Sequence, residues 1–336
     1  MEITTSEMHT GGEALRIIET GFPKIVGKSI LEKRRYAKEN LEHLRKFLMY
    51  EPRGHKDMYG AVLVEPDLKE ADVGVLFMHN EGYSTMCGHA IIALGRYVVD
   101  KGIVKPIVGQ SETQVNIQCP CGLVRAHVEM IDGDKTGRVR FHSIPAFTFA
   151  TDVKINVPRY GEVAVDIAYG GAFYAFIDAQ KLDLDVRTSN CQDLTNAASA
   201  VTEAAKTQVK LLHPDDQDLA FLYGTILTDG KDEFTDEPTA NVCIFADREV
   251  DRSPTGSGVT ARIALQYQKK LIPVGKTRRF INGLTGSEFT GKVVNETSCG
   301  SFPAVVVEVA GNAFYSGKSA FIKEDNDEFG NGFLIR

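Results

Sequence analysis

The sequence has no long hydrophobic run and very little clustered positive charge. No apolar stretch reaches the ~18 residues that a membrane-spanning helix needs, and the first residues lack a basic region followed by an apolar run. The longest basic run is the triplet Lys33–Arg34–Arg35, in a chain of formal net charge −7. These absences argue against a membrane anchor and against a nucleic-acid or anionic-membrane partner, and they predict a cytoplasmic protein.

Cysteine is also sparse, with six residues at scattered positions in a chain of 336. This is not the pattern of a disulfide framework, so we expect reduced thiols that are available for chemistry. With 43% hydrophobic residues, a chain of this length can bury a large core. It is expected to form two domains rather than one.

The stretch Asp251–Gly258 combines the features of an anion-binding site. It follows an apolar, strand-like segment at 241–246 and leads into a segment with helical periodicity at 259–267. The start of a helix presents unpaired N–H groups, and the two glycines at 256 and 258 would let a ligand approach the backbone closely. The sequence therefore predicts a site for a small anion, such as a carboxylate, flanked by Asp251 and Thr255.

A second stretch, at 84–90, has the same layout. It follows an apolar segment at 73–78 and opens a helix-like segment at 91–99, so Cys87 holds the position that Thr255 holds in the first stretch. The elements before each stretch also repeat: a double glycine, a strand, a capped helix and two strands. Because the offset is of domain size, we expect two similar halves. Two halves facing each other would bring Cys87 and Thr255 to opposite faces of one ligand.

Four motifs in these regions resemble the signatures of the proline racemase family, and the match spans nearly the whole chain. The motifs are Met86–Cys87–Gly88–His89–Ala90, Met8–His9–Thr10–Gly11–Gly12–Glu13, Glu51–Pro52–Arg53–Gly54–His55, and Asp251–Arg252–Ser253–Pro254 followed by Gly256 and Gly258. The resemblance implies an α+β, diaminopimelate-epimerase-like fold. It would have two pseudo-symmetric halves, each a β-barrel-like sheet around a central helix, with the site in the cleft between them. We expect the first half at residues 1–155, joined by the tail at 325–336, and the second at 156–324.

The family resemblance also implies chemistry for Cys87 and Thr255. Members that racemise proline or epimerise 4-hydroxyproline have a cysteine at both positions, and Thr255 is the departure that marks the trans-3-hydroxy-L-proline dehydratase branch. A thiolate at a helix N-terminus is a plausible base for the α-proton, whereas a threonine hydroxyl is too weak an acid to return a proton. The expected activity is that of a hydro-lyase: Cys87 removes the α-proton and the 3-hydroxyl leaves. The products would be Δ1-pyrroline-2-carboxylate and water, with no cofactor and no metal.

Five residues are expected to bind the substrate: Gly88, His89, Asp251, Gly256 and Ser257. The backbone N–H groups at 88–89 and 256–257 would bind the carboxylate. His89 and Asp251 would contact the ring nitrogen, with Asp251 as the counter-charge to its ammonium. A homodimer is possible, and the sequence does not decide it.

Two other functions remain open. The protein could be an isomerase, a proline racemase or 4-hydroxyproline 2-epimerase, that uses a hydroxyl in place of the second thiol. It could also be a non-enzymatic binder of proline-like ligands, although an intact Cys87 argues against that.

Two cofactor motifs are weaker. The glycines at 256 and 258 with Ala261 match a dinucleotide-binding fingerprint, but residues 259–287 contain no acidic residue for the ribose. Cys87 and His89 could join Cys119 and Cys121 in a zinc site, but the spacings are not those of a C-x-x-C motif. Strand alternation would place Cys119 and Cys121 on one face, where we expect ordinary packing residues.

Overall fold

The computed structural model describes residues 1–133 and 135–335, which divide into two units. Unit 1 comprises Met1–Val139 and Asn312–Arg336, and unit 2 comprises Arg140–Gly311. Both divisions lie earlier in the chain than the expected positions at 155/156 and 324/325. The reason is strand pairing: β9 (Ala146–Val157) pairs with β10 (Gly161–Tyr169) in unit 2, and β18 (Ala313–Ile322) pairs with β1 (Glu2–Thr10) in unit 1.

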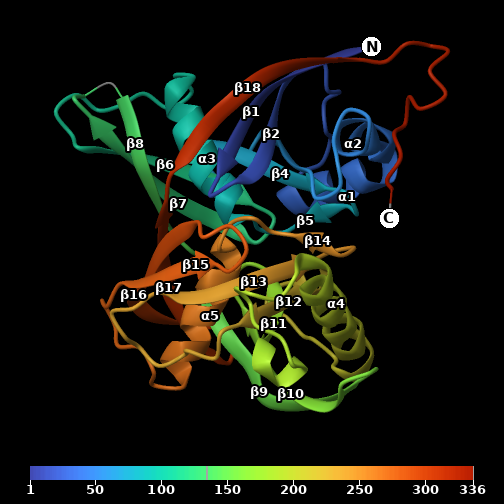
Figure 1. Ribbon diagram of the computed structural model, residues 1–336. Coiled ribbons are helices and arrows are strands. Elements are labelled where there is room, and N and C mark those ends of the chain that lie inside the picture. The colour runs from blue at the N-terminus through green and yellow to red at the C-terminus, as the bar shows by residue number, and fades with distance from the viewer. Residues whose placement is uncertain (134, 336) are drawn as a thin grey trace. The chain divides into compact units, whose positions relative to one another are not determined.

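Unit 1 is a mixed sheet that curves around helix α3 (Gly88–Asp100) (Figure 1). Its first strand, β1, pairs antiparallel with β2. The following pairs are, in order, β2–β3 parallel, β3–β4 antiparallel, β4–β5 antiparallel, β4–β6 parallel and β6–β7 antiparallel. These strands are β2 (Glu13–Thr20), β3 (Tyr59–Val64), β4 (Val73–His79), β5 (Tyr83–Ser84), β6 (Glu112–Cys119) and β7 (Gly122–Ile131). Strand β8 (Lys135–His142) follows β7.

Two short helices, α1 (Ile30–Asn40) and α2 (Glu42–Met49), pack on β4 in unit 1. The side chain of Ser29 caps α1 by accepting a 3.2 Å hydrogen bond from the N–H of Glu32. The backbone of Leu41 leaves the helical region (φ −119°, ψ 14°), so the chain turns there and the second helix starts.

Unit 2 repeats the pairing order of unit 1. The pairs are, in order, β10–β11 antiparallel, β11–β12 parallel, β12–β13 antiparallel, β13–β14 antiparallel, β13–β15 parallel, β15–β16 antiparallel and β16–β17 antiparallel. These strands are β11 (Phe173–Asp178), β12 (Leu222–Thr228), β13 (Thr239–Phe245), β14 (Glu249–Val250), β15 (Arg278–Asn282), β16 (Glu288–Cys299) and β17 (Phe302–Gly311). The internal repeat predicted from the sequence is therefore confirmed.

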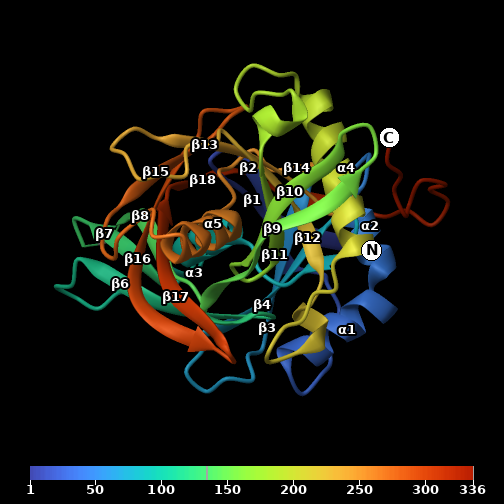
Figure 2. The same ribbon diagram turned by 90° about the horizontal axis from the view of Figure 1, so that it is seen from below.

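Helix α5 (Gly256–Gln268) takes in unit 2 the place that α3 takes in unit 1. It contacts β9, β10, β11, β16 and β17, and Figure 2 shows it nearly end-on among these strands. Helix α4 (Cys191–Gln208) packs on the outside of the sheet, and the short 3-10 helices η1 (Ala179–Leu182) and η2 (Gln217–Leu219) lie in connections. The α+β fold, with a barrel-like sheet around one central helix in each unit, is as expected.

The two central helices are buried on almost every side, which explains their composition. Nearly all residues of α3 are buried and apolar, as a helix enclosed by a sheet requires. Helix α5 also buries Arg262, whose guanidinium donates to Asp232 at 2.9 Å and to Thr239 at 2.8 Å. None of the described helices is long and apolar enough to cross a membrane.

Candidate active site

Cys87 is the N-cap residue of α3. Its backbone is extended (φ −147°, ψ 107°), and its carbonyl accepts the helical hydrogen bond from Ile91 N–H at 3.0 Å. The N–H groups of the first turn precede any helical acceptor, so they form the positive end of the helix dipole. The thiol makes no cap hydrogen bond and is buried, with 5% of the residue exposed. The N-terminus of a helix is a position that favours the thiolate form of a cysteine.

The thiol of Cys87 lies against the imidazole of His89. The distance from Sγ is 3.1 Å to Nδ1 and 3.8 Å to Nε2. Burial lowers the pKa of His89 to about 3, against a smaller opposite effect of a hydrogen bond to the Ala14 backbone, so the ring is neutral at pH 7. Tyr59 packs edge-on at 4.9 Å, and Thr10 donates to the His89 carbonyl at 2.9 Å. The contact between the ring and Cys87 was not predicted from the sequence.

Two further cysteines lie near Cys87. Cys119 ends β6, and the N–H of Cys121 donates to the Thr85 carbonyl at 3.2 Å. Burial raises the pKa of the Cys119 thiol well above its ordinary value, and the neighbouring Cys121 and Cys87 raise it further. Cys121 lies in the turn before β7, so the prediction of one shared strand face was wrong. Within the described part of the chain, these three thiols and His89 do not form a group with the spacing of metal ligands.

Thr255 is the N-cap residue of α5 and matches Cys87 in position, each within its own unit. Its carbonyl accepts the helical hydrogen bond from Val259 N–H at 2.7 Å. Unlike Cys87, it has a positive φ (φ 67°, ψ 92°), which strains a β-branched residue by roughly 1–3 kcal/mol. Two hydrogen bonds hold it there: its N–H donates to Ser253 Oγ at 3.1 Å, and its hydroxyl donates to Asp251 Oδ2 at 2.8 Å.

Asp251 is a buried carboxyl group beside this helix N-terminus. Its Oδ1 accepts from Ser253 N–H at 2.7 Å, and Asn282 holds the segment by donating to the carbonyls of Asp251 and Ser253 at 2.8 Å each. Burial raises the pKa of Asp251 to about 6, although the hydrogen bonds from Ser253 and Thr255 and the charge of Arg252 oppose the rise. A carboxylate in this environment would be stabilised by a cationic ligand group.

The first turn of α5 is closely packed. Ser257 Oγ is hydrogen-bonded to the Tyr174 hydroxyl at 2.8 Å, and Gly256 is the first helical residue. A Cβ on Gly258 would lie 2.4 Å from Ile226 Cδ1, the end of a side chain that would have to shift to admit it. A Cβ on Gly170 would lie 2.3 Å from the Ser257 carbonyl oxygen, a backbone atom, so the β10–β11 turn needs its glycine.

Four residues that shape these helix N-termini were not singled out from the sequence: Tyr59, Tyr174, Ser253 and Asn282. Ser253 lies inside the Asp251–Gly258 stretch, two residues from Asp251 and two from Thr255. This spacing is typical of local hydrogen bonds between a side chain and a nearby backbone N–H, and it could have identified Ser253. The other three lie on β3, β11 and β15, and no local pattern connects them with a helix N-terminus.

Comparison with known proteins gives concordant matches along the chain. A family model described as proline racemase matches residues 6–334. A trans-L-3-hydroxyproline dehydratase of Xenopus tropicalis is 63% identical and covers 99% of this chain and 95% of that protein. A trans-3-hydroxy-L-proline dehydratase of Homo sapiens is 59% identical, with the same coverage of 99% and 95%. Among solved structures, a probable proline racemase from Agrobacterium radiobacter with bound carbonate has a TM-score of 0.92 at 27% identity, covering 99% of this chain and 96% of that one.

Proposed function

Because this chain belongs to the proline racemase family, we propose that it dehydrates trans-3-hydroxy-L-proline, with Cys87 as the base that removes the α-proton. One observation carries the proposal: a cysteine is the N-cap residue of α3, whereas a threonine is the N-cap residue of the equivalent helix α5. The relatives from Xenopus tropicalis and Homo sapiens, which are dehydratases for 3-hydroxyproline, support the same reaction here. The products are Δ1-pyrroline-2-carboxylate and water.

The surroundings of Cys87 suit a thiolate base. The α-proton of an amino acid is weakly acidic, so its removal needs a base that is ionised at neutral pH and held close to the carbon. The N-terminus of α3 supplies the electrostatic stabilisation. His89 is neutral, so it adds no charge of its own, and it fixes the side chain of Cys87 through the 3.1 Å contact.

The stereochemistry of the substrate allows Cys87 to act twice. In trans-3-hydroxy-L-proline the 3-hydroxyl lies on the same ring face as the α-hydrogen. Cys87 takes the α-proton, the Cα–H electron pair forms the C2–C3 double bond, and the C3–O bond breaks. The thiol then returns its proton to the departing hydroxide as water, which restores the thiolate. The enamine product isomerises to the cyclic imine.

The remaining candidate residues have binding roles. We assign the N–H groups of Gly88, His89, Gly256 and Ser257 to the substrate carboxylate, as donors at helix N-termini. Asp251 pairs with the ring ammonium when it is ionised, and His89 lies beside the same nitrogen. Thr255 holds the position of the second cysteine of racemases and cannot return a proton to Cα. We expect a cytoplasmic enzyme that works without a cofactor.

Turnover of stereoisomers tests the proposal. The purified protein is incubated with trans-3-hydroxy-L-proline, and the cyclic imine is trapped with o-aminobenzaldehyde. The matched controls are cis-3-hydroxy-L-proline, whose hydroxyl lies on the other face, and trans-4-hydroxy-L-proline. Only the trans-3 isomer is expected to give the imine.

Two outcomes would contradict the dehydratase. Loss of optical rotation from L-proline without imine formation would indicate an isomerase. Thermal stabilisation by trans-3-hydroxy-L-proline without any turnover would indicate a binding protein.

A further inference from the structure

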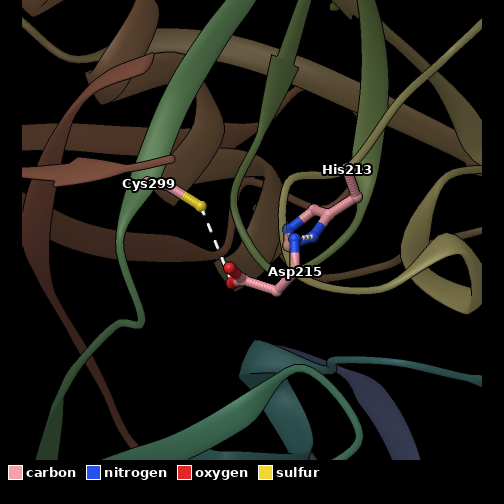
Figure 3. A group of neighbouring side chains, drawn as sticks. All are labelled: His213, Asp215 and Cys299. Carbon is pink, nitrogen blue, oxygen red and sulfur yellow. Dashed lines mark hydrogen bonds between the residues drawn. The ribbon is translucent and has the colours of Figure 1, made fainter. Parts of the chain in front are cut away.

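A cluster of His213, Asp215 and Cys299 lies in unit 2, outside the residues assigned to the reaction (Figure 3). One ligand atom from each side chain lies within 4.8 Å of the other two, and Cys299 Sγ is 3.9 Å from Asp215 Oδ2. Cys299 ends β16 at its turn into β17, whereas the other two residues lie in the connection between α4 and η2. Figure 3 shows the three side chains converging from these two segments.

We propose that these three side chains bind a divalent metal ion, Zn²⁺ by preference, which joins the β16–β17 turn to the connection after α4. One nitrogen, one oxygen and one sulfur donor form a set of borderline softness that suits Zn²⁺. Three protein ligands leave the fourth tetrahedral position for water, and the exposed side chain of Asp215 gives access from solvent.

The imidazole of His213 is the strongest evidence for a ligand. The residue is 9% exposed, and its Nε2 has no hydrogen-bond partner within the described residues. A buried nitrogen without a partner costs roughly 1–3 kcal/mol, which a bound ion would recover. The ring is held by Tyr169, edge-on with centroids 4.6 Å apart, and its Nδ1 accepts from Asp215 N–H at 3.2 Å.

The two segments pack directly against each other. A Cβ on Gly300, the residue after Cys299, would lie 2.6 Å from Pro214 Cβ. Pro214 in turn stands between His213 and Asp215. The ligands are therefore brought together by packing of the two turns, so binding needs little rearrangement of the backbone.

A nucleophilic role for this cluster fits the structure less well. Burial, together with the neighbouring Asp215 carboxylate, raises the pKa of Cys299 to about 11, so the thiol is protonated at neutral pH. The Cys299 thiol donates to Asp215 Oδ2 and not to an imidazole base. On binding Zn²⁺, the Cys299 thiol would lose its proton to solvent. The ring proton of His213 would move from Nε2 to Nδ1, so that Nε2 can bind the ion. This would break the 3.2 Å hydrogen bond that Asp215 N–H donates to Nδ1.

Cobalt substitution tests the site directly. The full-length protein, stripped with a chelator, is titrated with Co²⁺ and then with Zn²⁺. We expect one equivalent of Co²⁺ with a thiolate-to-cobalt charge-transfer band, which Zn²⁺ abolishes. Cys299→Ser should lose the band, and Asp215→Asn should lose about tenfold or more in affinity. Cys191→Ser, which removes an exposed thiol of the same unit, should behave as the wild type.

Thermal unfolding gives a second readout, because an ion that binds only the folded state raises Tm. Zn²⁺ should raise the Tm of the wild type and of Cys191→Ser but not that of Asp215→Asn. Because Asp215 is exposed, its substitution should leave the fold intact, and circular dichroism checks this. The proposal is overturned if the wild type shows no sulfur-ligated Co²⁺. It is also overturned if Cys299→Ser keeps the band, which would place the ion on another thiol.

Discussion

Thr255 donates a 2.8 Å hydrogen bond to Asp251, and both side chains are buried at the start of α5. The hydroxyl that we propose to take the place of the second thiol of racemases is therefore engaged with a carboxylate. A threonine hydroxyl is also a far weaker acid than a thiol, so it cannot protonate a carbanion at a useful rate. In the proposed reaction, no acid at Thr255 competes with loss of the 3-hydroxyl.

Thr255→Cys should give the protein a measurable ability to invert proline or 4-hydroxyproline. Cysteine is close to threonine in size, and a thiol at this helix N-terminus would be activated in the way that we propose for Cys87. The measurement is the entry of deuterium at Cα of the inverted product in heavy water. Thr255→Ser is the matched control, because it keeps a hydroxyl and should show no inversion. A folded, ligand-binding Thr255→Cys variant without inversion would contradict the assigned role of Thr255.

Asp251 should make the folded state less stable as the pH rises through its titration. Its pKa is about 6 in the folded protein against an ordinary value of 3.8, so the folded state binds the proton more tightly than the unfolded state. The free energy of unfolding therefore falls between about pH 4 and 6, by about 3 kcal/mol in total. Asp251→Asn lacks this loss.

Urea unfolding of the wild type and of Asp251→Asn at pH 4 and at pH 7 measures the effect. The wild type should lose about 2 kcal/mol relative to the variant between pH 4 and pH 7, because the unfolded carboxyl is already partly ionised at pH 4. Equal pH dependence of the two proteins would mean that Asp251 is not held in a desolvating environment.

Gly170→Ala should destabilise unit 2 and disturb the first turn of α5. The added Cβ would lie 2.3 Å from the Ser257 carbonyl oxygen and 2.6 Å from the Ala261 nitrogen, and these backbone atoms cannot move aside easily. Overpacking of this kind costs about 1–3 kcal/mol. Gly82→Ala, where the new Cβ meets nothing within 4 Å, is the matched control and should be nearly neutral in urea unfolding. A Gly170→Ala variant as stable as the control would show that the turn is not packed against the helix as described.

The repeat and the two helix N-termini were predictable because each depends on local patterns. Strand-like runs, a capped helix and the glycines that mark turns recur in the same order in both halves, and they place Cys87 and Thr255 at equivalent N-cap positions. The family motifs then connected these positions with a reaction. All of this information is contained in short segments of the chain.

Features that depend on distant segments were not predictable in the same way. Tyr174 reaches Ser257 from β11, and no spacing in the sequence reveals that bond. Gly258 looks like a ligand-approach glycine, but its neighbour Ile226 comes from β12. The divisions between the units depend on the partners of strands β9 and β18, which are set by tertiary pairing and not by the composition of these strands.

The most direct test of the account is the turnover of trans-3-hydroxy-L-proline by Cys87→Ser beside Cys191→Ser. An alcohol in place of the thiol is almost un-ionised at neutral pH, so Cys87→Ser should lose at least about 10²- to 10⁴-fold in kcat, the range that a general base contributes. Circular dichroism should show an unchanged fold, and Cys191→Ser, which alters an exposed thiol in unit 2, should keep wild-type turnover. A Cys87→Ser protein that retains more than about a tenth of the wild-type rate would contradict the assignment of Cys87 as the base.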